Sequence, residues 1–253
     1  MLKKFFVLSG GGCRGFAHLG VVKALQEHDI YPAEIAGTSA GSIAGAFLAN
    51  GFTPDEVKDL FVNKLKPNML AWNGFKMGLV SMNKIKDFIQ KNLRYTNFED
   101  LPIPFYATAT NFIDGRQHIF HKGRIIDAII AASSIPILFP PVFIDDIPFV
   151  DGGLSNNLPV EPFVHKMNEV ISIYVNPISL FNPEETAVQL MDRTLHLIHR
   201  EMIGRASAGS LLYIEPVELQ KFGLFDIHKT PDIFEIGYSY TKELLRNTKI
   251  MMA

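Results

Sequence analysis

The chain is poor in cysteine: its 253 residues include one, Cys13. A single cysteine cannot form an internal disulfide or build a zinc site by itself, so the fold must depend on its core, and a reducing compartment is expected. There is no run of about eighteen apolar residues, and the apolar stretch at residues 5–8 is too short for a secretory signal. We therefore expect no membrane span and a cytoplasmic location.

The chain also lacks an excess of charge of one sign, because its formal net charge at pH 7 is -2. This balance gives no overall attraction to nucleic acid, which is not expected as a partner, or to an anionic membrane, although a local patch is still allowed. Hydrophobic residues make up 47% of the chain and glycine and proline are spread along it, which argues against disorder and against a fibrous repeat. The length suits a single α/β domain over residues 1–253.

Short apolar strands alternate with helical patterns in the first fifty residues. A strand at residues 4–8 runs into glycines and is followed by a helix over residues 16–28. A second strand at residues 35–37 precedes a helix over residues 42–50. Two successive βα units predict a parallel sheet.

The second of these units contains a G-x-S-x-G pattern, GTSAG, at residues 37–41. A nucleophilic serine needs a sharp turn from strand to helix, and flanking glycines allow that turn without Cβ clashes. The helix that starts at Ala40 also directs its positive N-terminal end at Ser39. The pattern predicts Ser39 as a nucleophile, with a structural Gly/Ser turn as the alternative.

The first unit contains GGGCRG at residues 10–15, again between a strand and a helix. Consecutive glycines can point several backbone N–H groups into one small volume, which is what an oxyanion hole requires. Gly10, Gly12 and Gly15 also fit the G-x-G-x-x-G spacing of a dinucleotide-binding turn. That site would need an acid at the end of the second strand, where this chain has Ser39, so an oxyanion site is favoured and a structural glycine turn is the alternative.

A third motif, DGG, begins at Asp151 after strand-like residues at 142–150. An aspartate at the end of a parallel strand meets groups from other strand ends at the carboxyl edge of the sheet, where Ser39 is also expected. Asp-Gly alone is most often a turn. The prediction that Asp151 acts with Ser39 therefore depends on the other motifs.

These motifs, with ASSIP at residues 132–136 and FPP at residues 139–141, occur in the order and approximate spacing of patatin-like phospholipases. Residues 5–160 resemble that family. The resemblance implies a three-layer α/β/α fold with a mostly parallel central sheet, and a catalytic dyad of Ser39 and Asp151. It also implies an oxyanion hole at four positions: Gly11, Gly12, Cys13 and Arg14.

The implied function is hydrolysis of fatty acyl esters of lipids, of the phospholipase A or lysophospholipase type, through an acyl-serine and without a metal or cofactor. An ordinary carboxylate is a poor base for a serine hydroxyl, so burial must raise its basicity or the site must stabilise charge strongly. Thioester or small-ester hydrolysis and transacylation by the same serine remain alternatives. A nucleotide- or phosphate-binding protein that uses the glycine turn is an alternative of another class.

The histidines and the cysteine receive no catalytic role. His18 is expected on a helix surface or in packing. His196 and His199 are one helical turn apart but lack the H-E-x-x-H form and an evident third ligand, so a solvated or partly packed face is expected there. Cys13 is expected to be a small filler beside the oxyanion site, and Arg14 to hold the glycine turn or to add positive charge.

Residues 57–94 contain eight Lys or Arg against two acids, together with apolar side chains such as Trp72 and Phe75. This composition predicts that the segment is a lipid-facing lid or an interface-binding surface that makes peripheral membrane contact, because it pairs apolar insertion with attraction to anionic headgroups. In the alternative interpretation the apolar residues belong to the core and the lysines lie on solvated helix faces.

Overall fold

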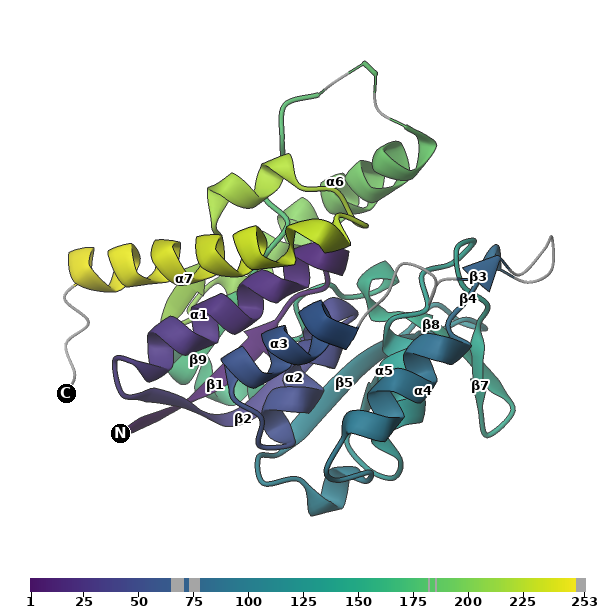
Figure 1. Ribbon diagram of the computed structural model, residues 1–253, viewed down its shortest axis with the longest axis horizontal. Coiled ribbons are helices and arrows are strands. Elements are labelled where there is room, and N and C mark those ends of the chain that lie inside the picture. Colours follow the sequence, from purple (N-terminus) through teal and green to yellow (C-terminus); the bar gives the residue numbers. More distant parts are fainter. Residues whose placement is uncertain (65–70, 73–77, 182, 185, 249–253) are drawn as a thin grey trace.

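The computed structural model describes residues 1–64, 71–72, 78–181, 183–184 and 186–248. One eight-stranded sheet forms its centre, in the order β10-β9-β1-β2-β5-β8-β7 with β6 paired to β5 (Figure 1). The strands of this sheet are β1 (Leu2–Leu8), β2 (Ile30–Thr38), β5 (Phe105–Asn111), β6 (Gln117–Phe120), β7 (Val142–Ile144), β8 (Ile147–Asp151), β9 (Val170–Ile173) and β10 (Leu212–Ile214). A separate antiparallel pair consists of β3 (Ala71–Trp72) and β4 (Val80–Ser81).

Helices cover both faces of the sheet, so the predicted three-layer α/β/α fold with a mostly parallel sheet is confirmed (Figure 1). The α-helices are α1 (Phe16–Gln26), α2 (Ala40–Ala49), α3 (Pro54–Lys64), α4 (Asn83–Asn92), α5 (Ile125–Ala132), α6 (Ala187–Ser207) and α7 (Thr230–Asn247). Short 3-10 helices include η1 (Gly12–Gly15), η4 (Gly152–Leu154), η5 (Glu161–Glu169), η6 (Val217–Lys221) and η7 (Ile227–Lys229).

The two faces of β1 show why this strand lies in the middle of the molecule. Phe6 and Leu8 pack into the core beneath α1, α2 and α7, whereas Phe5 and Val7 pack on the opposite face with residues of η5 and α6. Successive side chains of a strand point to opposite faces, so a run without polar residues fits only a strand that is covered on both sides.

The predicted βα units are present, and two expectations about the following strands need correction. β1 pairs with β2 in parallel, as expected. Residues 142–150 form a hairpin of β7 and β8, because Asp145 and Asp146 adopt positive φ angles of 48° and 61° and reverse the chain. β8 also pairs antiparallel with β5, so the expectation that Asp151 ends a parallel strand is wrong.

None of the helices in the described ranges combines the length and the apolar character that a membrane span requires.

Candidate active site

Ser39 lies on a strained turn between β2 and α2. Its φ and ψ angles are 52° and -123°, a conformation that non-glycine residues rarely adopt. A Cβ atom on Gly37 would lie 2.4 Å from the carbonyl oxygen of Gly41, and one on Gly41 would lie 2.3 Å from that of Leu8. Both motif glycines are therefore needed for the turn, as the sequence indicates.

The backbone around Ser39 is held by hydrogen bonds to neighbouring segments. Its N–H donates to the carbonyl of Ala132, and its own carbonyl accepts from the Ser42 N–H, from the Ser42 hydroxyl at 2.7 Å and from the Ser133 hydroxyl at 3.2 Å. These contacts compensate for the unfavourable backbone angles and fix the side chain at the edge of the sheet.

Asp151 reaches the same edge from the opposite direction. In the ladders on either side of β5, Asp151 lies opposite Ala109, and Thr38 lies opposite Thr108. Because Ala109 and Thr108 are neighbours, the last residue of the antiparallel strand β8 lies beside the last residues of β2. The register, and not a parallel orientation, brings Asp151 to Ser39.

The two side chains meet directly. The Ser39 hydroxyl donates to Oδ2 of Asp151 at 2.6 Å, and the N–H of Gly153 donates to Oδ1 at 2.7 Å. Ser39 is 7% exposed and Asp151 is 6% exposed. Burial raises the pKa of Asp151 to about 6, and the hydrogen bonds from Ser39 and Gly153 oppose this rise. The carboxylate is therefore more basic than an ordinary one.

The glycine turn faces this pair with two free backbone donors. The N–H of Cys13 donates to the carbonyl of Leu224 at 3.0 Å, and the N–H of Arg14 donates to the carbonyl of Gly11 at 3.1 Å. Within the described residues, the N–H groups of Gly11 and Gly12 have no acceptor. Of the four positions predicted for an oxyanion hole, two offer unpaired donors, and two have amides that already donate to backbone carbonyls.

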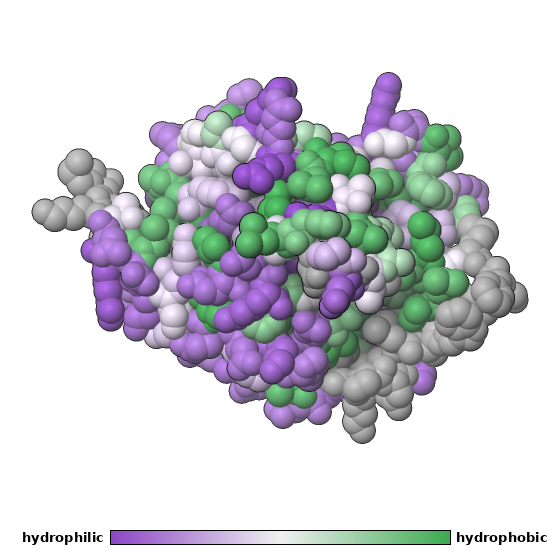
Figure 2. All heavy atoms as spheres, turned by 90° about the horizontal axis from the view of Figure 1, so that it is seen from above, coloured by the Kyte–Doolittle hydropathy of each residue, from purple (hydrophilic) through white to green (hydrophobic). Residues whose placement is uncertain are grey.

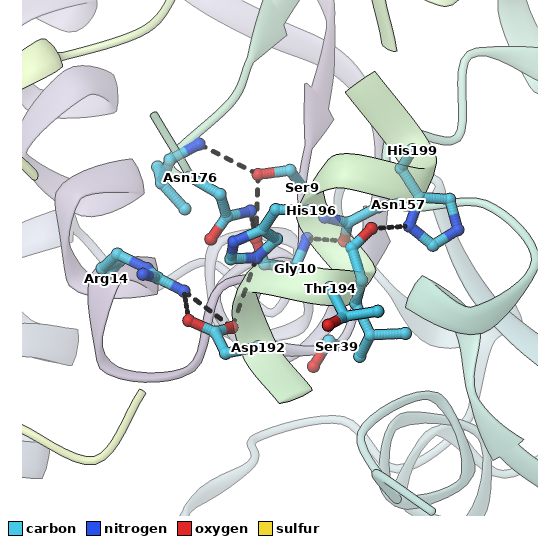
Figure 3. Close-up of polar contacts among 12 residues, drawn as sticks. Ser9, Gly10, Arg14, Ser39, Asn157, Asn176, Asp192, Thr194, His196 and His199 are labelled. Atoms are coloured by element: carbon cyan, nitrogen blue, oxygen red, sulfur yellow. Dashed lines mark hydrogen bonds and ion pairs between the residues drawn. The ribbon is translucent and has the colours of Figure 1, made fainter. Parts of the chain in front are cut away.

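The side chain of Arg14 is paired with other segments of the chain. Its guanidinium donates to both carboxylate oxygens of Asp192 on α6, at 2.9 and 3.1 Å, and to the carbonyl of Phe222 at 3.2 Å (Figure 3). These contacts are consistent with the first of the two roles expected for Arg14, which is to hold the glycine turn in place.

Cys13 is buried beside the turn. Burial, together with the Asp226 carboxylate, raises the pKa of its thiol to about 12. The thiol stays protonated at neutral pH and is a poor nucleophile.

Two cavities meet at Ser39. The smaller, called the dyad cavity here, has a volume of about 60 Å³ and is lined by Ser39, Asp151, the glycine turn, Asn157 and residues of α6. The larger, called the apolar cavity, has a volume of about 170 Å³. Its walls come from α1, α2, α3, α4 and the segment before η7, and include Phe16, Ile43, Phe61, Met82, Ile85 and Phe139.

The histidines take positions that the sequence only partly indicates. His18 is fully buried, with Nε2 2.8 Å from the carbonyl oxygen of Ser9, and burial lowers its pKa to about 4. His196 and His199 are packed against the protein and line the dyad cavity. Burial lowers the pKa of His196 to about 4. Among the described residues no group of three His, Cys, Asp or Glu side chains is placed to hold a metal ion.

Four features of the site have no counterpart in the sequence prediction: Asn157, Asn176, Leu224 and the inner side of α6. Asn176 follows the buried strand β9, and Asn157 follows Asp151 by six residues. A polar residue at the carboxyl end of a parallel strand is a signal that could draw attention to Asn176. Leu224 and α6 carry no comparable signal.

The mostly parallel sheet thus brings a serine on a strained turn against a buried aspartate, beside two unpaired glycine amides. The family model of patatin-like phospholipases matches residues 6–164, and the chain belongs to this family.

Two similar proteins are longer than this chain. An uncharacterized NTE family protein of Mycobacterium tuberculosis is 32% identical over 162 residues, which are 61% of this chain and 44% of that protein. Lysophospholipase NTE1 of Kluyveromyces lactis is 26% identical over 275 residues, which cover 95% of this chain and 19% of that enzyme. This chain therefore spans less than half the length of both.

A solved structure shares the fold. VipD from Legionella pneumophila superposes with a TM-score of 0.58 at 16% identity, covering 96% of this chain and 66% of that chain.

Proposed function

We propose that this protein is a serine hydrolase that cleaves fatty acyl esters of lipids, of the phospholipase A or lysophospholipase type. The observation that carries the proposal is the 2.6 Å hydrogen bond from Ser39 to Asp151 at the junction of an apolar cavity and two unpaired glycine amides. Nucleophile, base, anion donors and a place for an acyl chain thus occur together.

In the proposed mechanism Ser39 Oγ attacks the ester carbonyl carbon while Asp151 accepts the hydroxyl proton. The alkoxide of the alcohol product leaves with a proton returned by Asp151, and an acyl-serine remains. Water then attacks this ester with Asp151 again as base, which releases the fatty acid and restores the serine. The raised pKa of Asp151 favours both proton transfers.

The N–H groups of Gly11 and Gly12 are the proposed oxyanion donors. A negatively charged oxygen forms in each tetrahedral intermediate, and fixed backbone donors stabilise it more than they stabilise the neutral ester. Cys13 and Arg14 belong to the same turn, and we assign them a supporting role because their amides already have acceptors.

The apolar cavity is the proposed site of the acyl chain. Ser39 lies on its wall, opposite aromatic and aliphatic side chains of α1, α3 and α4. Each methylene group buried there contributes about 0.8 kcal/mol to binding. Hydrolysis of thioesters or small esters, and acyl transfer to another alcohol, would use the same dyad. These alternatives within the enzyme class therefore differ in substrate and not in catalytic residues.

A nucleotide-binding role for the glycine turn has less support. The amides of Cys13 and Arg14 are engaged, and the N–H of Gly10 donates to Asn157 at 2.9 Å. Two free amides are few for a pyrophosphate, and Ser39 occupies the place of the acid that would hold a ribose.

We keep a cytoplasmic location with peripheral membrane contact as part of the proposal. Trp72 and Phe75, on which the predicted contact through residues 57–94 depends, have side chains outside the described part of the structure. Val57, Phe61 and Met82 within that range are buried, which favours the core interpretation for them.

The described surface offers a second place for membrane contact on α6 (Figure 2). Its inner side lines the dyad cavity. Four large apolar residues of the same helix are exposed: Leu190, Leu197, Ile198 and Met202. Figure 2 shows hydrophobic side chains on the face of the molecule that it presents. We expect L197E/I198E to lower sedimentation with phospholipid vesicles and to leave hydrolysis of a soluble ester unchanged. Equal vesicle binding by wild type and variant would remove α6 from the proposal.

Covalent labelling tests the proposed chemistry. A fluorophosphonate probe should label the wild type and S210A, a serine outside the site, and should not label S39A. A panel of phospholipids, lysophospholipids, glycerides and acyl thioesters then defines the substrate, with S39A and D151N as inactive controls. Labelling that persists in S39A, or hydrolysis that persists in both controls, would contradict the assignment.

A further inference from the structure

The peptide group between Gly10 and Gly11 is held by the side chain of the distant residue Asn176 and by that of the neighbouring residue Ser9. Its carbonyl oxygen, on Gly10, accepts from Nδ2 of Asn176 at 2.7 Å and from the hydroxyl of Ser9 at 3.0 Å. Figure 3 shows Asn176 and Ser9 beside Gly10, next to the end of β1. Asn176 is 0% exposed.

The direction of this carbonyl fixes the direction of the Gly11 N–H. In a planar trans peptide the C=O and the N–H that follows it point to opposite sides. Because both donors lie on the carbonyl side, the N–H of Gly11 points away from Asn176 and Ser9. Gly11 borders the dyad cavity together with Ser39, and its N–H is one of the two unpaired donors.

The glycine turn cannot hold this orientation by local sterics alone. Consecutive glycines have little steric preference, so rotation of a whole peptide group between them costs little. Replacing Gly11 would not solve the problem, because its Cβ would lie 2.6 Å from Cγ2 of Val175 and 2.8 Å from Oδ1 of Asn176. External donors must therefore select the orientation.

The Ser9 hydroxyl and Asn157 complete the arrangement. Ser9 Oγ accepts from the N–H of Val175 at 3.1 Å, which leaves its own proton for the Gly10 carbonyl. On the other side of Gly10, its N–H donates to Oδ1 of Asn157 at 2.9 Å. Both peptide groups that flank Gly10 are thus fixed by buried side chains.

Stability alone does not account for Asn176. Its side chain also hydrogen-bonds Tyr174, but its Oδ1 is buried and has no hydrogen-bond partner among the described residues. A buried polar atom without a partner is unfavourable, so this oxygen does not stabilise the fold.

We propose that Asn176 is a positioning residue for the oxyanion hole, which orients the Gly10–Gly11 peptide so that the Gly11 N–H faces the developing negative charge. The proposal rests on the proposed hydrolase function. It adds a residue that lies outside the family motifs and outside residues 6–164, the part that the family model matches.

The test compares two buried asparagines with the same substitution. In N176L the carbonyl of Gly10 keeps only Ser9 as donor, and we expect kcat to fall on the order of 100-fold with KM within about threefold, since one oxyanion donor is misplaced. The melting temperature should not fall. Asn50 is equally buried but fully bonded, through Nδ2 to Tyr95 and through Oδ1 to two backbone N–H groups. N50L should therefore lose stability and keep the kcat of its folded fraction.

A second readout separates positioning from structural damage. A trifluoromethyl ketone with an acyl tail forms a tetrahedral adduct with an oxyanion, whereas a long-chain alcohol with the same tail carries no charged oxygen and forms no adduct. N176L should weaken inhibition by the ketone by about the factor lost in kcat and leave binding of the alcohol unchanged. Parallel loss of both affinities, or an unchanged kcat in N176L, would overturn the proposal.

S9A keeps the test decisive if N176L does not fold. It removes the other donor to the Gly10 carbonyl, and we expect kcat to fall on the order of 10-fold with unchanged KM. Full kcat in S9A would overturn the proposal. A wild type that shows no Ser39-dependent hydrolysis would instead refute the proposed function, so the two failures can be told apart.

Discussion

The carboxyl group of Asp151 links the chemistry of the site to pH. A base must be ionised before it can accept the Ser39 proton, and the pKa of Asp151 is raised to about 6 by burial. We therefore expect kcat/KM for a soluble ester to rise as the pH increases through 6 and to level off above it. A rate that is constant from pH 4.5 to 8, measured with the protein still folded, would contradict the role of Asp151.

The same pKa makes Asp151 costly for the fold. Its ordinary value is 3.8, so the folded protein holds this proton more tightly than the unfolded chain does, and stability is lost as the pH rises from about 4 through 6. Above pH 6 the free energy of unfolding is lower by about 3 kcal/mol than it would be with an unshifted carboxyl group. This value follows from the pKa rise from 3.8 to about 6.

D151N removes this ionisation. We expect the variant to be inactive, and its free energy of unfolding relative to that of wild type to be larger at pH 8 than at pH 4.5. Urea unfolding of both proteins at the two pH values measures this difference, in which all other titrating groups cancel. A difference that does not change with pH would show that Asp151 is ionised at a lower pH than the structure indicates.

Ser39 and Asp151 can be located from the sequence because tight turns place glycines beside them. The asparagines that hold Gly10 cannot be located in this way. Asn157 and Asn176 lie 147 and 166 residues from Gly10 in the chain, and no short pattern marks an asparagine whose partner is a distant backbone group. The raised pKa of Asp151 cannot be predicted from the sequence, because burial depends on the packed structure. The sequence indicates only that the proposed chemistry requires it.

At the scale of elements, α1 and α7 cross with their backbones almost in contact. A Cβ atom on Gly20 of α1 would lie 2.0 Å from the carbonyl oxygen of Phe234, and one on Gly237 of α7 would lie 2.3 Å from that of Ala17. Both carbonyl oxygens belong to helix backbones and cannot move independently. Close approach of the two helices therefore requires glycine at both positions.

The substitution G237A tests this contact, with G204A as a matched control. Ala at 237 must push the helices apart, and we expect it to lower the free energy of unfolding by about 1–3 kcal/mol. Gly204 lies in α6, and a Cβ atom added there would meet no neighbouring atom within 4 Å, so G204A should raise stability by up to about 1 kcal/mol through helix propensity alone. Urea unfolding should show changes of opposite sign, and equal changes would refute the proposed close contact.

The strands and helices predicted in the first fifty residues are all present, and the main miss has a physical cause. Residues 142–150 look like one strand because most of them are β-branched or aromatic. The reversal at Asp145 and Asp146 uses positive φ angles, for which Asn-Gly or Asp-Gly is the usual signal. Without a glycine the sequence does not reveal the hairpin, and the direction it predicts for β8 is therefore wrong.

At the scale of the whole molecule, the sheet extends beyond the part that the family model matches. Residues 6–164 include β2, β5 and β8, but β9 pairs with β1, and β10 pairs with β9. The helix α7 covers α1, and Ile203 of α6 packs on the other face of the sheet. The predicted single domain over residues 1–253 is consistent with these contacts and stays a prediction until unfolding is measured.

A truncation provides that measurement. A chain that ends at residue 164 leaves β1 as an edge strand and exposes Phe5 and Val7, which the full chain buries against residues of β9 and α6. It also removes Asn176 from the glycine turn. We expect this fragment to be insoluble or without a cooperative unfolding transition, whereas full-length protein and a chain that ends at residue 248 should each unfold in one transition. A fragment 1–164 that unfolds cooperatively and reacts with a fluorophosphonate at Ser39 would show that the remaining strands and helices form a separate unit, and that the oxyanion hole does not need Asn176.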